Sequence, residues 1–367
     1  MSEIGIGIVG GGYMGKAHAV AFSAVAAVFD TDLRPRLEMV CASTPASAER
    51  YRAAFGFARA TDDWRVLVNN PRVEAIVIAS PQDTHSDIAL AAFALGKPVL
   101  CEKPLAETPE TARQMVAAAE AAGVTNMTGF NYIRTPATQF ARKLIQDGRI
   151  GTVTSFRGEM TEDFMADPDM APTWRNFGEA NGCMGDLAPH PINCAHTLIG
   201  PIEAVFALVE RVHATRGGAD VVNDDQAHLT VRFASGVHGS IFVSRVATGR
   251  KMGYAYDIYG TKGAIRFDGE DQNALWLYTA EGPEAERGFR KILTGPAHPD
   301  YLPFCQGPGH GTGYQDQITI EAKDFLNAIS SGTPVWPTFA EGLAVNQVVA
   351  ASLASSREGA WVNVADY

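Results

Sequence analysis

The sequence has few cysteines, and none of them are clustered. Its five cysteines are scattered through 367 residues without a C-x-x-C pair. An odd number of unclustered cysteines argues against both a disulfide framework and a cysteine-rich zinc site. No set of histidines shows metal-ligand spacing either. We therefore expect reduced thiols in a cytoplasmic protein and no bound metal.

Basic residues and long apolar runs are also scarce. Lysine and arginine number 30 against 41 aspartates and glutamates, for a formal net charge of −11, and no Lys/Arg run stands out. This excludes the electrostatic footprint of a nucleic-acid-binding protein. No apolar stretch reaches the length of a membrane span, and neither a basic region nor a cleavage site flanks Ile4–Val9. We expect a soluble globular protein with neither nucleic-acid nor membrane partners.

The first part of the chain alternates short apolar runs with alanine-rich helical stretches. This alternation is typical of β-α-β units and a doubly wound parallel sheet, so we expect an α/β Rossmann domain over residues 1–130. The expected strands are Ile4–Val9, Leu37–Ala42, Ala75–Ala79, Pro98–Cys101 and Thr125–Gly129. The expected helices are Met14–Ala27, Ala46–Phe55, Thr84–Leu95 and Thr108–Ala122.

Beyond a helix at Pro136–Gln146 the chain becomes rich in strands joined by glycine turns. We expect residues 131–367 to form an α+β substrate-binding domain with a large, mainly antiparallel, open sheet. Its exposed face predicts a homo-oligomer, either a homodimer or a homotetramer. A Gly- and Pro-rich excursion covers residues 281–315. The expected strands are Val153–Met160, Val205–Val212, Ala227–Phe233, Val237–Val243, Tyr254–Tyr259 and Ala274–Tyr278, and two helices, Asp316–Ser330 and Ala340–Ser355, are expected to pack on one face of this sheet.

A glycine fingerprint follows the first expected strand. Gly10-Gly11-Gly12-Tyr13-Met14-Gly15 satisfies G-x-G-x-x-G between a strand and a helix, the context in which this motif binds a dinucleotide. Gly10 permits the tight turn, Gly12 lets the backbone approach a pyrophosphate, and Gly15 lets helix and strand pack closely. A plain glycine turn is the alternative, but this position favours dinucleotide binding.

The end of the second expected strand lacks the acid that commonly holds the adenosine ribose. Ala42 stands there, followed by Ser43 and Thr44. These two hydroxyls could accept a 2′-phosphate, which favours NADP, or they could cap the next helix. The cofactor is therefore NAD or NADP, with both alternatives open.

Two further segments end strands at the carboxyl edge of the sheet, where open α/β folds bind ligands. They are Ser80-Pro81-Gln82-Asp83-Thr84-His85 and Cys101-Glu102-Lys103-Pro104. A lysine at this edge can donate to a substrate hydroxyl and stabilise a developing alkoxide. An isolated lysine is more commonly an ordinary surface residue.

Asp186 and His190 are four residues apart, so on a helix they would share a face. A histidine with a near-neutral pKa can take the proton of a hydroxyl while hydride leaves the same carbon, and a nearby carboxylate would orient it. The alternative is a capping aspartate beside a half-buried histidine.

These motifs together resemble the Gfo/Idh/MocA oxidoreductase family over essentially the whole chain. Its E-K-P signature matches Glu102, Lys103 and Pro104, and its G-D-x-x-x-H signature matches Gly185, Asp186 and His190. The resemblance implies that Lys103 and His190 are the catalytic pair, supported by Asp186, and that Lys103–Pro104 is a cis peptide. It also implies cofactor contacts from the glycine loop and the strand-end segments, and from a Trp-Arg pair. The cofactor-binding residues are then Gly10, Gly12, Tyr13, Met14, Gly15, Ser43, Thr44, Ser80, Pro81, His85, Glu102, Lys103, Trp174 and Arg175.

Several other segments resemble the levoglucosan dehydrogenase-like branch of that family. They are Phe130-Asn131-Tyr132, Arg134-Thr135-Pro136-Ala137, Phe156-Arg157-Gly158 with Asp163, Trp174-Arg175, Gly288-Phe289-Arg290 and Thr294-Gly295-Pro296-Ala297-His298-Pro299. The resemblance implies NAD(P)-dependent oxidation of a secondary hydroxyl of a sugar, anhydrosugar, glycoside or cyclitol to a ketone, with C3 of a levoglucosan-like pyranose favoured. Ala42 departs from the NAD-dependent pattern.

Recognition of a polyol needs several oriented polar groups. The expected substrate-binding residues are Lys103, Asn131, Tyr132, Asp163, Asp186, His190 and Tyr314. For each of the four that are not catalytic, a structural role is the alternative. For three of them that role is specific: Asp163 would cap a turn, Tyr132 would lie in the core and Tyr314 would begin a helix. Two other functions compete with the dehydrogenase: an NADPH-dependent keto-sugar reductase, and a non-catalytic sensor of dinucleotide or sugar.

Overall fold

The computed structural model describes residues 2–171 and 173–367, apart from the side chains of Trp174 and Glu179. The chain forms two compact units. Unit 1 comprises Met1–Arg134 and Gly313–Leu343, and unit 2 comprises Thr135–Thr312 and Ala344–Tyr367. Within the described residues, no helix combines the length and apolar character needed to cross a membrane.

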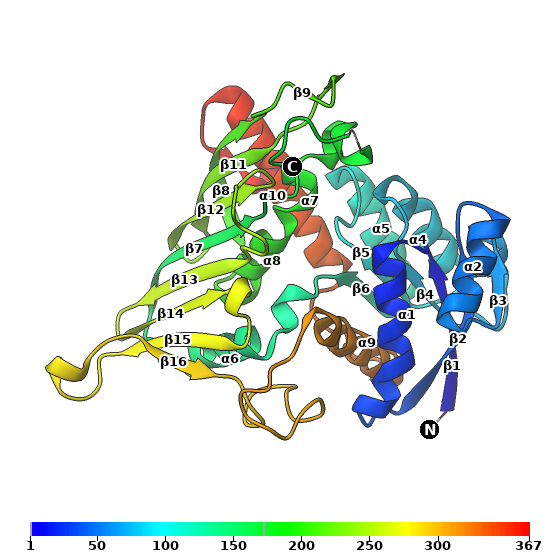
Figure 1. Ribbon diagram of the computed structural model, residues 1–367, viewed down its shortest axis with the longest axis horizontal. Helices are drawn as coiled ribbons and strands as arrows, with labels where there is room; N and C mark the ends of the chain where they lie inside the picture. The colour runs from blue at the N-terminus through cyan, green and yellow to red at the C-terminus, as the bar shows by residue number, and fades with distance from the viewer. Residues whose placement is uncertain (1, 172) are drawn as a thin grey trace. The chain divides into compact units, whose positions relative to one another are not determined.

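Unit 1 is built on a six-stranded parallel sheet, as the alternating pattern predicts (Figure 1). The strand order is β3-β2-β1-β4-β5-β6, which is the doubly wound Rossmann arrangement. The strands are β1 (Ser2–Val9), β2 (Leu33–Cys41), β3 (Arg59–Thr61), β4 (Ala75–Ile78), β5 (Val99–Glu102) and β6 (Asn126–Gly129). The helices are α1 (Tyr13–Val28), α2 (Pro45–Phe55), α3 (Trp64–Asn69), α4 (His85–Ala94), α5 (Pro109–Ala122) and α9 (Tyr314–Ser331). The short β3 and α3 were not expected, because neither has enough residues to show a period.

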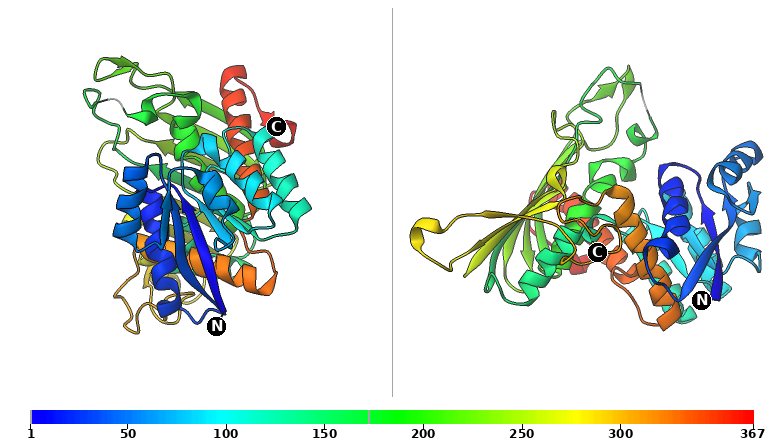
Figure 2. Two further views of the ribbon diagram at one scale, coloured as in Figure 1. Left: turned by 90° about the vertical axis from the view of Figure 1, so that its right-hand side faces the viewer. Right: turned by 60° about the horizontal axis from the view of Figure 1, so that its bottom comes forward.

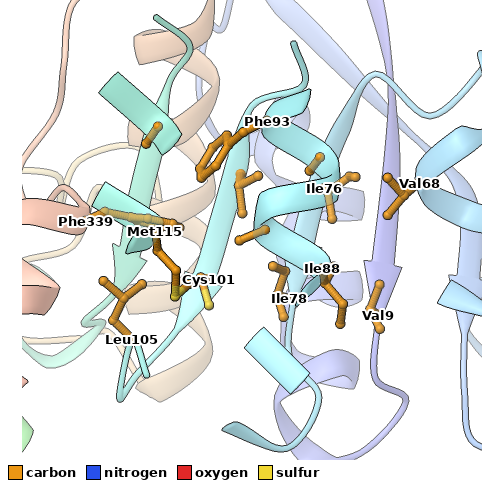
Figure 3. Packing of buried hydrophobic residues seen from close by; sticks show 14 of the residues in the cluster. Val9, Val68, Ile76, Ile78, Ile88, Phe93, Cys101, Leu105, Met115 and Phe339 are labelled. Atoms are coloured by element: carbon orange, nitrogen blue, oxygen red, sulfur yellow. The ribbon is translucent and has the colours of Figure 1, made fainter. Parts of the chain in front are cut away.

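The apolar core of unit 1 joins the sheet to the helices that cover it. Ile76 and Ile78 of β4 and Ile88 of α4 belong to one hydrophobic cluster, and all three are fully buried (Figure 3). Val68 of α3 belongs to the same cluster. The continuous apolar run of β4 follows from this arrangement, since a parallel strand covered on both faces has no polar side.

Helix α9 belongs to unit 1, although it follows the whole excursion of residues 281–315. It packs against α1: Phe22 and Phe325 meet edge to face at 6.5 Å, and the Gln315 side-chain amide donates to the Ala17 carbonyl at 2.9 Å. The expectation that this helix packs on the sheet of the second domain was wrong. The local pattern predicts an amphipathic helix but does not indicate which surface its apolar face packs against.

Unit 2 contains a nine-stranded mixed sheet, mainly antiparallel as expected. Its order is β16-β15-β14-β13-β7-β12-β11-β8-β17, in which β7 and β12 run parallel. The strands are β7 (Val153–Thr161), β8 (Ile202–Glu210), β11 (Gln226–Phe233), β12 (His238–Ser244), β13 (Ala255–Gly260), β14 (Gly263–Asp268), β15 (Ala274–Thr279), β16 (Arg290–Leu293) and β17 (Val362–Asn363), beside a small hairpin of β9 (Thr215–Arg216) and β10 (Ala219–Asp220).

Helices pack against this sheet from one side. Helix α6 (Pro136–Gln146) contacts β14 and β15, and α8 (Pro189–Leu198) contacts β7; Figures 1 and 2 show both on the same face. The short α7 (Cys183–Asp186) precedes α8, and α10 (Phe339–Glu358) begins in unit 1 and continues in unit 2. The opposite face of the sheet is therefore the open one.

Helix α3 offers a matched test of the unit 1 core. Val68 is fully buried, whereas 51% of Val66 is exposed. Val68→Ala should lower the free energy of unfolding by about 2 kcal/mol, because two buried methyl groups are lost and a cavity remains. Val66→Ala should change it by less than about 0.5 kcal/mol. Chemical denaturation of both variants measures the difference, and equal losses would contradict this packing.

Candidate functional site

The three glycines of the fingerprint differ in how much space surrounds them. Main-chain atoms lie close to Gly10 and Gly15, and no described atom lies close to the Cβ position of Gly12. Gly10 has a φ of 107°, and a Cβ there would lie 2.3 Å from the Ala79 carbonyl oxygen. A Cβ on Gly15 would lie 1.9 Å from the Gly10 carbonyl oxygen, whereas one on Gly12 would meet no described atom within 4 Å. The roles expected of Gly10 and Gly15 thus match real close approaches, and Gly12 leaves room for a ligand.

The start of α1 fits a phosphate group. Helix α1 begins at Tyr13, and within the described chain no side chain caps it at Gly12 and no acidic residue lies in its first turn. Free N–H groups and the positive end of the helix dipole favour an anion here. The residues present therefore fit the pyrophosphate of a dinucleotide.

The two hydroxyl residues after β2, Ser43 and Thr44, could either bind a 2′-phosphate or cap the next helix, and the structure shows the role of Thr44. Thr44 caps α2: its side chain accepts from the Ser47 N–H at 3.1 Å, and its own N–H donates to Ser47 Oγ at 3.2 Å. Thr44 therefore has the capping role, while Ser43 is exposed. The Ala42 N–H donates to the Thr61 carbonyl at 3.2 Å, so Asp62 and Asp63 follow directly beside this position.

His85 connects the loops that follow β4 and β5. Its Nε2 lies 3.0 Å from the Ser80 carbonyl oxygen and its Nδ1 lies 3.1 Å from that of Pro104. Burial lowers the pKa of this imidazole. A main-chain oxygen therefore faces each ring nitrogen, and the single N–H of the neutral ring donates to one of them, according to the tautomer. The cofactor contacts expected of His85, Ser80 and Pro81 remain predictions.

The E-K-P segment turns away from the end of β5 with its glutamate side chain buried. The Lys103–Pro104 peptide is cis, as the resemblance implies. One carboxylate oxygen of Glu102 lies 2.8 Å from His18 Nε2, and the other accepts the Lys103 N–H at 3.3 Å. His18 was not among the expected site residues, although it falls on the buried side of α1 with Gly15, Phe22 and Val25. The sequence feature that could have identified His18 is a histidine on the apolar side of a helix.

Three tyrosines gather beside the glycine loop. The ring of Tyr314, the first residue of α9, lies 5.8 Å from that of Tyr13 and 5.9 Å from that of Tyr132, and its hydroxyl donates to Met14 Sδ at 3.2 Å. Tyr314 thus adjoins the dinucleotide loop, and Tyr132 adjoins Tyr314. Asn131 instead is buried, and its side-chain amide donates to Gln317 Oε1 at 3.0 Å.

The second signature lies in unit 2, whereas Lys103 lies in unit 1. Asp186 ends α7 and His190 lies at the start of α8, so the single helix expected to carry both is two short helices instead. Pro189 and Pro191 flank His190 and lack the N–H groups that a continuous helix needs. His190 is buried, and Asp186 accepts a hydrogen bond from Arg175 Nε at 3.2 Å. The side chain of Trp174 lies outside the described part of the chain.

A buried charge network supports the Arg175 segment, and no pattern in the sequence predicts it. Asp225 accepts from Arg216 at 2.8 Å and from Arg245 at 2.9 Å, and all three are almost fully buried. Arg245 and Asn223 both donate to the Arg175 carbonyl, at 3.0 and 2.8 Å. Buried ion pairs of this kind fix local geometry more than they stabilise the fold, so the network positions Arg175.

Asp163 occupies a surface ion pair. Its carboxylate contacts Lys251 Nζ at 2.7 and 2.9 Å and accepts the Gly249 N–H at 3.0 Å. The Lys251 ammonium and this N–H hold the pKa of Asp163 below its usual range. The turn-capping alternative therefore has structural support, and a substrate contact from Asp163 stays a prediction.

The fold and the glycine loop define a class: a dinucleotide-binding enzyme with a Rossmann unit and a second α+β unit. The comparisons make this specific. A family model described as "Oxidoreductase family, NAD-binding Rossmann fold" matches residues 4–130, and one described as "GFO/IDH/MocA C-terminal domain" matches residues 138–266. The chain belongs to the Gfo/Idh/MocA family of oxidoreductases and carries its NAD-binding Rossmann domain.

Individual relatives are similar over almost the full chain. Levoglucosan dehydrogenase of Pseudarthrobacter phenanthrenivorans is 36% identical, with 99% of each chain covered. Inositol 2-dehydrogenase of Rhizobium meliloti is 28% identical, with 98% of each covered. A solved structure of levoglucosan dehydrogenase in complex with NADH and levoglucosan has a TM-score of 0.96 at 36% identity, covering 99% of this chain and 100% of the other.

Gly12 provides a test of dinucleotide binding that separates the loop from the fold. Gly12→Ala should leave the thermal unfolding temperature unchanged, because its Cβ meets no described atom within 4 Å. It should weaken NADH binding by about tenfold or more, because the methyl group would occupy the approach of the pyrophosphate. Fluorescence titration with NADH measures this.

Gly288→Ala is the matched control, since a Cβ at Gly288 also meets no described atom within 4 Å and this glycine lies in unit 2. It should alter neither quantity. Unchanged NADH affinity in Gly12→Ala would contradict the placement of the pyrophosphate.

Proposed function

We propose that this enzyme oxidises a secondary hydroxyl of a pyranose, anhydrosugar, glycoside or cyclitol to a ketone, with C3 of a levoglucosan-like sugar the favoured position. The observation that carries the proposal is the full-length likeness to levoglucosan dehydrogenase, including its complex with NADH and levoglucosan. The likeness to an inositol dehydrogenase supports the wider substrate class. Secondary hydroxyls on a six-membered ring are common to all of these compounds.

We assign the catalytic roles from the E-K-P and G-D-x-x-x-H signatures. Bound nicotinamide supplies the hydride acceptor. Lys103 donates a hydrogen bond to the reacting oxygen, which stabilises the developing alkoxide. His190 accepts the hydroxyl proton as the hydride leaves the same carbon. Asp186, which pairs with Arg175 at 3.2 Å, supports this set. Tyr132 and Tyr314 are proposed to contact sugar hydroxyls, because Tyr314 adjoins the glycine loop and Tyr132 adjoins Tyr314.

For the cofactor we propose NAD rather than NADP. Thr44 is engaged as a helix cap, which leaves Ser43 as the hydroxyl available to a 2′-phosphate. Asp62 and Asp63 follow the residue that pairs with Ala42, and two carboxylates at this edge disfavour an additional phosphate. The competing proposal, a keto-sugar reductase using NADPH, rests on the missing acid at Ala42. The ratio of kcat/KM for NAD and NADP separates them.

A cytoplasmic location goes with this proposal. All five cysteines are free thiols, and four of them are buried. Free thiols persist in the reducing environment of the cytoplasm, where NAD is also available. Fractionation of cells that produce the protein tests the location.

His190→Ala tests the assignment of the base. We expect kcat to fall by about 100-fold or more, because general-base catalysis typically contributes that much. NADH affinity should change by less than about threefold. The measurement is the initial rate at 340 nm on levoglucosan, glucosides and inositols with NAD and NADP in parallel. His196→Ala, on the same helix, is the control and should keep most of the activity. Normal turnover by His190→Ala would remove His190 from the mechanism.

We also propose that the open face of the unit 2 sheet joins copies of this chain. Leu208, His228 and Phe242 lie side by side in register on β8, β11 and β12. Leu208 is 56% exposed, and the rings of His228 and Phe242 stack at 4.4 Å. The adjacent residues on these strands, Ala207 and Leu229, are buried, as expected for side chains on the opposite, helix-covered face of the sheet. The exposed Leu208 and the half-buried Phe242 on the uncovered face of this sheet favour an interface there.

Light scattering tests this interface. The wild-type protein should have a mass that is a multiple of the 39.2 kDa chain, as a homodimer or homotetramer. Leu208→Asp should shift it toward the monomer, because the new carboxylate would be buried without a partner. Val222→Asp is the control, since Val222 is 59% exposed but lies outside the sheet. A monomeric wild-type protein would rule the proposal out.

A further inference from the structure

His18 lies in the interior of unit 1 with a charged neighbour. It is on α1, three residues after the last glycine of the fingerprint, and its side chain is fully buried. Its Nε2 lies 2.8 Å from Glu102 Oε1. A titratable ring in such a place contributes to the reaction only through Glu102, since the ring itself is shielded from any ligand.

Glu102 connects this ring to the catalytic segment. While Oε1 contacts His18, Oε2 accepts the Lys103 main-chain N–H at 3.3 Å. The same carboxylate lies against the backbone of β6, where a Cβ on Gly129 would be 3.1 Å from Oε1. With 7% of Glu102 exposed, its charge depends on neighbours for compensation. One carboxylate thus contacts both the His18 ring and the Lys103 main chain.

A second buried carboxylate completes the group. His18, Glu102 and Glu321 of α9 each place a nitrogen or oxygen atom within 4.8 Å of the other two. Glu321 Oε1 lies 3.4 Å from Arg134 Nη1, and Arg134 Nε donates to Asp324 Oδ2 at 3.0 Å. In the described chain, His18 Nδ1 and Glu321 Oε2 have no hydrogen-bond partner. Incompletely bonded buried groups are costly and in native proteins call for an explanation.

The pKa directions support an exchangeable proton in this group. Burial opposes charge on His18, but the hydrogen bond and charge of Glu102, with the charge of Glu321, outweigh it and raise the pKa of His18. Burial raises the pKa of Glu321 to about 7, against the opposing effect of Arg134. The pKa of Glu321 therefore lies within the range in which an enzyme works.

Two other titratable side chains are influenced by Glu102 but do not neutralise it. Burial raises the pKa of Tyr314, which keeps its phenol neutral, and burial lowers the pKa of His85, which keeps its imidazole neutral. His18 is thus the group of the three whose protonation compensates the charge of Glu102.

We propose that His18 is a positioning residue, which holds Glu102 and, through it, the main chain of Lys103 by donating its Nε2 proton to Glu102, while the charge of Glu321 favours the imidazolium form. The inference rests on the role proposed above for Lys103 in the oxidation of a sugar hydroxyl. The imidazolium form binds Glu102 with a charge-assisted hydrogen bond, which is shorter and stronger than a neutral one. The neutral form retains an ordinary hydrogen bond and positions Lys103 less firmly.

The same three side chains could in principle bind a divalent cation, and the geometry favours the proton. A separation of 2.8 Å between Nε2 and Oε1 is that of a direct hydrogen bond. The Arg134 guanidinium next to Glu321 would repel a second positive charge.

The first experiment reads the His18 proton directly and does not depend on catalysis. In the full-length protein with NAD bound, NMR titration of the His18 ring should give a pKa above that of an ordinary histidine. Glu321→Gln should lower this pKa, because an anion that stabilises the imidazolium is removed. Thr319→Val, a buried substitution on the same helix, should not change it. A His18 that stays neutral down to about pH 6 would overturn the proposal, as would stoichiometric metal that is lost in His18→Gln.

The second experiment compares His18→Gln with the wild-type enzyme across the pH range. Glutamine replaces the neutral imidazole as a donor but cannot be charged. The ratio of wild-type to variant kcat should therefore be about tenfold at low pH and approach one as the pH rises through the pKa of His18. Glu321→Gln should move that transition to lower pH. NADH affinity should change by less than about threefold in each variant.

The outcomes separate the two proposals. A wild-type enzyme that oxidises no sugar, with His18 titrating as expected by NMR, would contradict the proposed function and leave the charge-assisted contact of His18 with Glu102 in place. An active enzyme in which the ratio of wild-type to His18→Gln kcat does not vary with pH would show that His18 has only a packing role.

Discussion

The parallel pairing of β1 with β2 and β4 determines where each loop of the dinucleotide-binding edge begins. Because the three strands end side by side, the turn at Gly10 must fit between the ends of its neighbours. Its N–H donates to the Cys41 carbonyl of β2 at 2.9 Å, and a Cβ on it would approach the Ala79 carbonyl to 2.3 Å. Only glycine meets that limit at a φ of 107°. Once this turn is fixed, α1 starts in the one place where its free N–H groups serve a phosphate.

The parts of the fold that the sequence predicted are those that depend on local pattern. The strands expected in unit 1 are short apolar runs that alternate with helical stretches, and the glycine fingerprint marks the turn between β1 and α1. The destination of α9 was not predictable in this way. Its apolar face is suited to any apolar surface, and the choice of α1 depends on contacts such as Phe22 with Phe325, which are 303 positions apart in the numbering.

The site residues also fall into two groups, those that a local motif predicts and those that it does not. The signatures at Lys103 and His190 are short and contiguous, so they could be found by reading along the chain. The charge network of Asp225, Arg216 and Arg245 could not, because charged residues are normally exposed and nothing in the sequence marks these as buried. The same holds for Arg134, which is 2% exposed and contacts α9 through Glu321 and Asp324.

The buried charges also explain how α9 influences the loops after β5 and β6, although these loops lie far from it in the sequence. Glu321 of this helix contributes to the negative potential around His18, and His18 contacts Glu102. Arg134 is held by α9 and in turn donates to the Phe130 carbonyl at 3.1 Å, just beyond β6. Helix α9 therefore completes the electrostatics of the loops after β5 and β6, in addition to covering α1. A Rossmann unit without this returning segment would leave Arg134 and His18 without their carboxylate partner at Glu321, so the discontinuous unit 1 is required by its charges as much as by its apolar core.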